Sequence, residues 1–176
     1  MTATPVARIS VRIPRDTFYL GLVRKVVVEL AGRVGFGAQA TAEIEMAVDE
    51  ACSNAIRHAG RGLLAAADEF VASRLDTPDP GGGPLGRRIE TEIAVEASAG
   101  PDALTVTLTD GGAPFAFDRC GSGTADLEAY LAARTPNGLG VYIIKRFMDE
   151  VEYRHVPSVG NEIRMTKYLV TASSKP

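Results

Sequence analysis

Three polar side chains recur every four residues between positions 50 and 58. The segment reads Glu50-Ala-Cys-Ser-Asn54-Ala-Ile-Arg-His58 and lies within residues 41–59, whose apolar spacing predicts a helix. Each step of four residues turns a helical side chain by only about 40°, so the three share one face. Asn54 offers a carbonyl oxygen suited to Mg²⁺, and Glu50 could accept a proton or orient a water. The alternative is an ordinary solvated polar face with a structural histidine.

A second segment places a carboxylate at the end of a strand. Apolar residues alternate with threonines over residues 103–109, which predicts a half-buried strand that ends at Asp110. A carboxylate in this place suits recognition of an exocyclic amine, and Gly112 permits close approach of the backbone. The alternative is an ordinary Asp-Gly turn.

A third segment opens a helix with glycines. Gly138 and Gly140 stand at the start of the helical run 139–149. Backbone amides at the beginning of a helix lie at the positive end of its dipole and form a natural phosphate site. A single Gly-x-Gly pair is weak support, so the interpretation depends on the other two segments.

In this order the three segments resemble the GHKL ATPase superfamily, and most closely the anti-sigma factor serine kinases of the RsbW and SpoIIAB type. Residues 50–58 resemble the N box of these kinases, residues 110–115 their first glycine box and residues 138–151 their second. Residues 161–167 resemble their closing strand. The resemblance covers residues from about 5 to 170, which is nearly the whole chain.

The resemblance implies an ATP site with Mg²⁺. It implies that Glu50 is the general base for a serine hydroxyl, that Asn54 is the metal ligand, and that Asp110 accepts a hydrogen bond from the adenine amino group. The other ATP-binding residues that it implies are Gly112, Gly138, Leu139, Gly140, Val141, Arg134 in the lid and Thr166 near the base edge.

The implied function is an ATP-dependent protein serine kinase that acts as an anti-sigma factor. It would phosphorylate a serine of a STAS-type anti-anti-sigma protein, sequester a sigma factor and form a homodimer. The family often has a lid arginine about two residues before the second glycine box, but Thr135 and Pro136 stand there, and the nearest arginine is Arg134. A nucleotide-binding regulatory module with little or no kinase activity is therefore the alternative.

A third interpretation is the catalytic domain of a histidine kinase. The only histidines are His58 and His155, and neither follows the pattern of a phospho-acceptor on a helical hairpin, which argues against a complete histidine kinase.

Composition predicts one ordinary globular domain over residues 1–176. The chain is 45% hydrophobic and 23% charged, and its net charge of −3 gives no reason to expect nucleic-acid binding. It has no apolar run long enough to cross a membrane and no signal-peptide pattern. Its two cysteines are too few for a disulfide framework or a zinc site. These features predict a cytoplasmic protein.

Periodicity predicts an α/β (α+β) two-layer sandwich, which agrees with the Bergerat-type ATP-binding fold that the resemblance implies. A mixed, mainly antiparallel sheet of about five strands would be covered on one face by helices. The expected strands are residues 6–13, 89–97, 103–109, 150–156 and 161–170, and the expected helices are 16–31, 41–59, 126–133 and 139–149. The apolar face expected for the first helix, which could serve the core or a dimer, comprises Tyr19, Leu22, Val23, Val26 and Leu30.

Two segments interrupt the expected core. An insertion at about 61–88 has a helical period up to Leu75 and then a stretch rich in glycine and proline, Thr77–Gly86. It is expected to form an extension of the preceding helix or a second short helix, followed by a mobile loop. It would be a tolerated surface insertion or a partner-binding element. An ATP lid is expected at about 116–137.

Overall fold

The structure of the protein is a computed structural model that describes residues 7–74, 92–112, 114, 117, 139–157 and 159–170, with the backbone alone described over 58–74. Several expected features lie outside these residues: the helix 126–133, most of the lid, Arg134, Gly138, the loop Thr77–Gly86 and the side chain of His58. They stay predictions.

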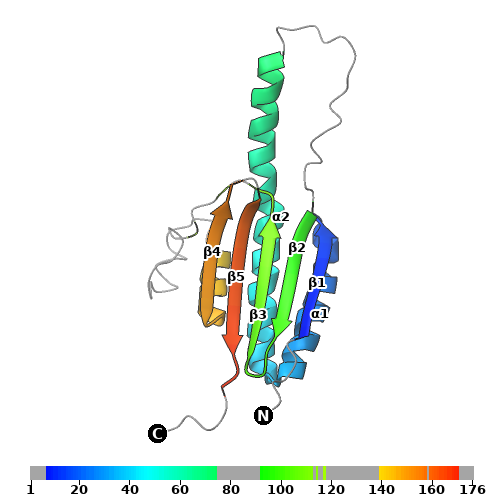
Figure 1. Cartoon of the computed structure of the whole chain (residues 1–176), viewed down its shortest axis with the longest axis vertical. Coiled ribbons are helices and arrows are strands. Elements are labelled where there is room, and N and C mark those ends of the chain that lie inside the picture. The colour runs from blue at the N-terminus through cyan, green and yellow to red at the C-terminus, as the bar shows by residue number, and fades with distance from the viewer. Residues whose placement is uncertain are drawn as a thin grey trace.

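One antiparallel sheet organises the chain (Figure 1). Its strands are β1 (Ala7–Pro14), β2 (Glu92–Ala99), β3 (Ala103–Asp110), β4 (Glu150–Val156) and β5 (Gly160–Tyr168). The spatial order is β1-β2-β3-β5-β4, and all four described pairings are antiparallel. The strand that comes last in the sequence, β5, therefore lies inside the sheet between β3 and β4.

Helices cover one face of this sheet (Figure 1). They are α1 (Leu20–Val34), α2 (Ala38–Arg74) and α4 (Leu139–Phe147), and a 3₁₀ turn, η1 (Thr17–Tyr19), precedes α1. The alternation of β3 explains the two layers, because its apolar residues and Asp110 are buried while the threonines between them are only half-buried. The predicted two-layer sandwich with a mainly antiparallel sheet is confirmed.

The first helix differs from its prediction. It starts at Leu20 rather than at residue 16, because Asp16 instead caps the 3₁₀ turn by accepting a hydrogen bond from the Phe18 amide. Val23 and Leu30 are buried as expected, but Tyr19 and Leu22 are 36% and 51% exposed. The buried stripe consists of Leu20, Val23, Val27, Leu30 and Ala31, and a residue next to that stripe in sequence points about 100° away from it.

Two further elements end later than the spans expected for them, and for the helix this is the extension that was one of the two expectations for the insertion. The strand expected at 89–97 is β2, which runs from 92 to 99, and its turn closes where the Gly100 amide donates to the Ala103 carbonyl at 2.8 Å. The helix expected at 41–59 is α2, a single helix of 37 residues. The segment after residue 59 thus continues the same helix to Arg74, and this half projects beyond the sheet in Figure 1.

A lysine ties three elements together at the end of the molecule opposite the projecting helix. Lys167 Nζ on β5 donates to the Phe147 carbonyl at the end of α4 at 2.7 Å. It also lies 3.2 Å from Glu43 Oε2 of α2 and 3.4 Å from Asp149 Oδ1. The contact with the last turn of α4 is favourable because a cation there opposes the negative end of the helix dipole. Within the described part of the chain, no helix is long and apolar enough to span a membrane.

Candidate functional site

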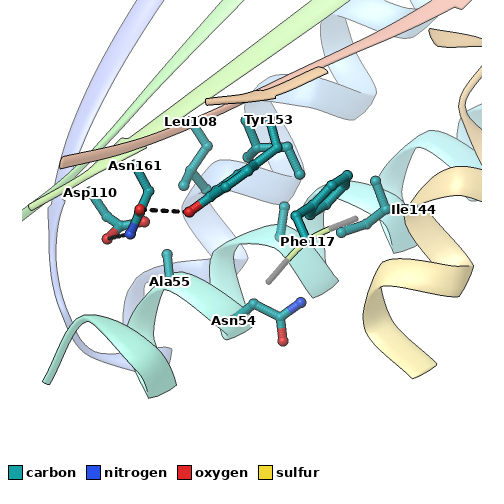
Figure 2. Close-up of a pocket in the computed structure, with 10 residues that line it drawn as sticks. Asn54, Ala55, Leu108, Asp110, Phe117, Ile144, Tyr153 and Asn161 are labelled. Atoms are coloured by element: carbon teal, nitrogen blue, oxygen red, sulfur yellow. Dashed lines mark hydrogen bonds between the residues drawn. The ribbon is translucent and has the colours of Figure 1, made fainter. Parts of the chain in front are cut away.

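Two strand ends and two helices meet at one pocket (Figure 2). Asp110 closes β3, and its cross-strand partner on β5 is Asn161. Asn54 and Ala55 of α2 line the pocket from the opposite side, and Ile144 of α4 closes it. The structure therefore brings together Asn54 and Asp110, which the sequence predicted from separate motifs.

Asp110 is a buried carboxylate with one oxygen already bonded. It is only 6% exposed, and its Oδ1 accepts hydrogen bonds from the Gly112 amide at 2.8 Å and from Asn161 Nδ2 at 3.0 Å. Among the described residues nothing donates to Oδ2, so this is the oxygen available to an exocyclic amine. Burial raises the pKa of Asp110, and the two hydrogen bonds and the charges of Arg15 and His155 oppose that rise.

Asn161 is the site residue that sequence reasoning missed. Its Oδ1 accepts a hydrogen bond from the Tyr153 hydroxyl at 2.8 Å (Figure 2). His155 Nδ1 lies 3.0 Å from the same oxygen. The only sequence signal was an asparagine after a glycine at the start of the closing strand, which has meaning only once β5 is known to pair with β3.

Glu50 and Asn54 share one face of α2, as predicted, and α4 packs directly against them. A Cβ atom built on Gly140 would lie 2.5 Å from Glu50 Oε2 and 2.9 Å from Asn54 Nδ2. Only glycine permits this approach, which brings the first turn of α4 to both side chains. The amides of that turn have no partner within the helix and point outward from its start.

Leu139 and Val141, which flank Gly140, have different environments. The Leu139 side chain is exposed, whereas Val141 is buried in the core. Their side chains thus do not converge on one ligand, and what they share is a place in the first turn of α4, where backbone amides can meet phosphate.

Arg57 lies beside the same pair, one turn further along α2. Its Nη2 donates to Asn54 Oδ1 at 3.3 Å and lies 3.7 Å from Glu50 Oε2. A cation is therefore already bound by the amide oxygen and the carboxylate. These are the oxygen ligands that Mg²⁺ prefers, so the residues fit the metal that the sequence analysis expected.

Phe117 fills much of the pocket (Figure 2). Its ring is buried, stacks on Tyr153 with centroids 5.2 Å apart, and has Lys145 Nζ 4.8 Å from its centroid. The cavity left beside it is about 20 Å³, which is room for roughly one water. A purine base can enter only if the Phe117 ring moves.

Thr166 is not part of this group, contrary to its predicted place near the base edge. It pairs with Thr105, and the two hydroxyls are 3.1 Å apart. Thr166 is five residues from Asn161 along β5, a distance of about 16 Å, and alternation turns its side chain to the other face of the sheet. Gly112, by contrast, lies at the site and donates to Asp110.

Comparisons with known proteins agree with this geometry. A family model described as "Histidine kinase-like ATPase domain" matches residues 13–167. The serine-protein kinase RsbW of Bacillus velezensis is 30% identical over 172 residues, covering 95% of this chain and 89% of that protein. The kinase of the same name from Bacillus pumilus is 30% identical over 92% of this chain and 85% of its own length. That of Bacillus cereus strain Q1 is 27% identical over the same shares.

Proposed function

The chain belongs to the histidine kinase-like ATPase family, of the GHKL type, and we propose that it is an ATP-dependent protein serine kinase acting as an anti-sigma factor. The observation that carries this proposal is the contact of Glu50 and Asn54 with Gly140, at a pocket that has Asp110 at its other end. Similarity to RsbW serine kinases over most of the chain supports the same activity.

The nucleotide would be held from both ends of this pocket. Asp110 Oδ2 accepts a hydrogen bond from the adenine amino group, and Gly112 allows the backbone to lie close to the base. The amides of residues 139–141 bind the phosphates at the start of α4, with Gly138 and Arg134 completing that end. Asn54 Oδ1 is the ligand for Mg²⁺, which when bound neutralises phosphate charge. Arg57, whose Nη2 donates to that oxygen at 3.3 Å, would move aside because its positive charge repels the metal.

Glu50 would act on the protein substrate. Its carboxylate takes the proton of a serine hydroxyl as the hydroxyl oxygen forms a bond to the γ-phosphorus, and ADP leaves with the electrons of the broken bond. We propose that this serine belongs to a STAS-type anti-anti-sigma protein and that the other partner is a sigma factor, held by a homodimer. A phosphate on the STAS protein adds negative charge that weakens its docking and frees the kinase for the sigma factor.

The alternative function is a nucleotide-binding regulator with little or no kinase activity. The observation that favours it is the Phe117 ring in the base pocket, together with Thr135 and Pro136 in place of a lid arginine.

A transfer assay with radiolabelled ATP separates the two functions. Wild type and Glu50→Gln are incubated with purified STAS proteins, and ADP affinity is measured in parallel by calorimetry. The kinase proposal predicts labelled STAS protein with wild type and 10²–10⁴-fold less, on the order of the loss of a general base, with Glu50→Gln. ADP and sigma factor binding without any transfer to a bound STAS protein would establish the regulator instead.

A further inference from the structure

Asn161 joins Asp110 to the outer hairpin of the sheet. It is 5% exposed and faces Asp110 across the β3–β5 pairing. Its amide nitrogen donates a hydrogen bond to Asp110 Oδ1 at 3.0 Å, and its amide oxygen accepts one from the Tyr153 hydroxyl at 2.8 Å. His155 Nδ1 is 3.0 Å from that oxygen. The amide is thus held at both ends by groups from different strands.

These partners allow only one orientation of the amide. A carboxylate accepts hydrogen bonds and cannot donate them when ionised, so the group facing Asp110 must be the NH₂. Turning the amide over would bring its carbonyl against the Asp110 carboxylate, acceptor to acceptor, and would take the acceptor away from Tyr153. The ionised Asp110 carboxylate therefore sets the direction of the amide, and the Tyr153 hydroxyl donates to the oxygen that is left at the other end.

The result is a carboxylate with a defined vacant acceptor. Gly112 and Asn161 both bond Oδ1, which leaves Oδ2 for a ligand. We propose that Asn161, held between Asp110 and Tyr153, is a positioning residue that keeps Asp110 a hydrogen-bond acceptor and so selects a 6-amino purine over a 6-oxo purine. This inference rests on the proposed ATP site and deepens it.

Electrostatics explain why the ionised form of Asp110 needs the hydrogen bond from Asn161. Burial raises the pKa of Asp110, and a protonated carboxyl could donate to the 6-oxo group of hypoxanthine. The groups that oppose the rise are the Gly112 and Asn161 donors and the charges of Arg15, just after β1, and His155 on β4. The pocket residues of α2 near Asp110 are uncharged, Asn54 and Ala55 among them. Asn161 is therefore one of few groups that hold the acceptor form.

The test compares ADP with inosine diphosphate, whose base has a 6-oxo group and an N1–H in place of the 6-amino group and the N1 acceptor of adenine, and has no 2-amino group. Affinities are measured by calorimetry between pH 5 and 8 for wild type, Asn161→Leu and Tyr153→Phe. Thr166→Val is the matched control, because it removes a hydrogen bond from the same strand on the opposite face. Melting temperatures establish that each variant folds, and Tyr153→Phe removes a single hydroxyl if Asn161→Leu does not fold.

The inference predicts that wild type prefers ADP and that Asn161→Leu weakens ADP binding by roughly tenfold or more, the worth of a hydrogen bond to a charged group. The affinity for inosine diphosphate should fall much less, so the ratio of ADP affinity to inosine diphosphate affinity should decrease. The pH below which ADP binding weakens should move to a higher value. Tyr153→Phe should change the affinity ratio and the pH dependence of ADP binding in the same direction, but by a smaller amount. Thr166→Val should change neither of them.

Two results would overturn the inference in distinguishable ways. If wild type and Asn161→Leu show the same ADP preference and the same pH profile while Asp110→Asn abolishes binding, Asn161 is only structural and the ATP site stands. If wild type binds neither diphosphate, the proposed function fails and takes this inference with it.

Discussion

Replacing Gly140 by alanine tests the contact between α4 and the polar pair on α2. The added methyl carbon would lie 2.5 Å from Glu50 Oε2 and 2.9 Å from Asn54 Nδ2. Both atoms are the ends of side chains that can turn aside, so the fold should survive. Alanine also favours a helix over glycine by about 1 kcal/mol. The melting temperature should therefore change by no more than roughly 4 °C.

The effect on chemistry should be much larger than the effect on stability. Ordinary van der Waals contact begins at 3.4 Å, so the Glu50 carboxylate must retreat by about 0.9 Å to accommodate the methyl group. A misplacement of about 1 Å at a reacting group costs on the order of 10²-fold in rate. ADP affinity should fall far less, because Asp110 lies at the other end of the pocket.

The assay measures phosphate transfer to a STAS protein beside ADP affinity and the melting temperature. Gly32→Ala in α1 is the matched control, because a Cβ there has nothing within 4 Å and should leave the rate unchanged. The double variant Glu50→Gln with Gly140→Ala should lose less activity than the product of the two separate losses, since both changes act on Glu50, although Gly140→Ala also displaces Asn54. A Gly140→Ala protein that transfers phosphate at the wild-type rate would refute the reasoning.

Three further variants or probes test other parts of the structure. Lys167→Met should lower stability by about 1–3 kcal/mol, because the Phe147 carbonyl loses its donor and the carboxylates of Glu43 and Asp149 each lose one cation; thermal unfolding checks this, and an unchanged melting temperature would contradict it. Burial raises the pKa of the Cys52 thiol to about 12, so Cys52 should resist iodoacetamide at pH 8 in folded protein and react in unfolded protein, with peptide mapping to separate it from Cys120. Because the folded state disfavours the thiolate, stability should be full below the unfolded pKa near 9.0 and decline as pH rises toward 12, which urea titrations at several pH values can follow. Phe117→Ala should raise the association rate constant of ADP in stopped-flow measurements, and a rate constant equal to that of wild type would show that the ring does not obstruct entry.

Local periodicity predicted the parts of this site that a single element determines. Glu50 and Asn54 lie on one helix face because helical geometry alone puts them there. Alternation likewise placed Asp110 on the buried face at the end of its strand. These predictions needed no knowledge of what each element packs against.

The residues that sequence reasoning missed or misplaced depend on pairing between distant segments. Asn161 bonds Asp110 although the two are 51 residues apart in sequence. No local sequence pattern predicts how β3 and β5 are aligned. Thr166 was expected near the base, but the same register moves it along the strand and to the other face. Leu22 was expected on one apolar face together with Val23, for the core or for a dimer, but the buried stripe of α1 includes Val23 and Val27 and leaves Leu22 exposed.

The place of β5 in the sheet has a consequence for how the protein is made. Chains are synthesised from the N-terminus, and domains fold as their parts emerge. A chain that has reached residue 156 can pair β1, β2 and β3, but β4 has no described neighbour in the sheet except β5. The position between β3 and β4 is occupied by residues 160–168, and these residues include Asn161, which donates to Asp110. The proposed base site would thus be completed at the last step of sheet assembly, and a chain without β5 would lack the Asn161 donor to Asp110. Nucleotide bound there would stabilise the finished fold alone.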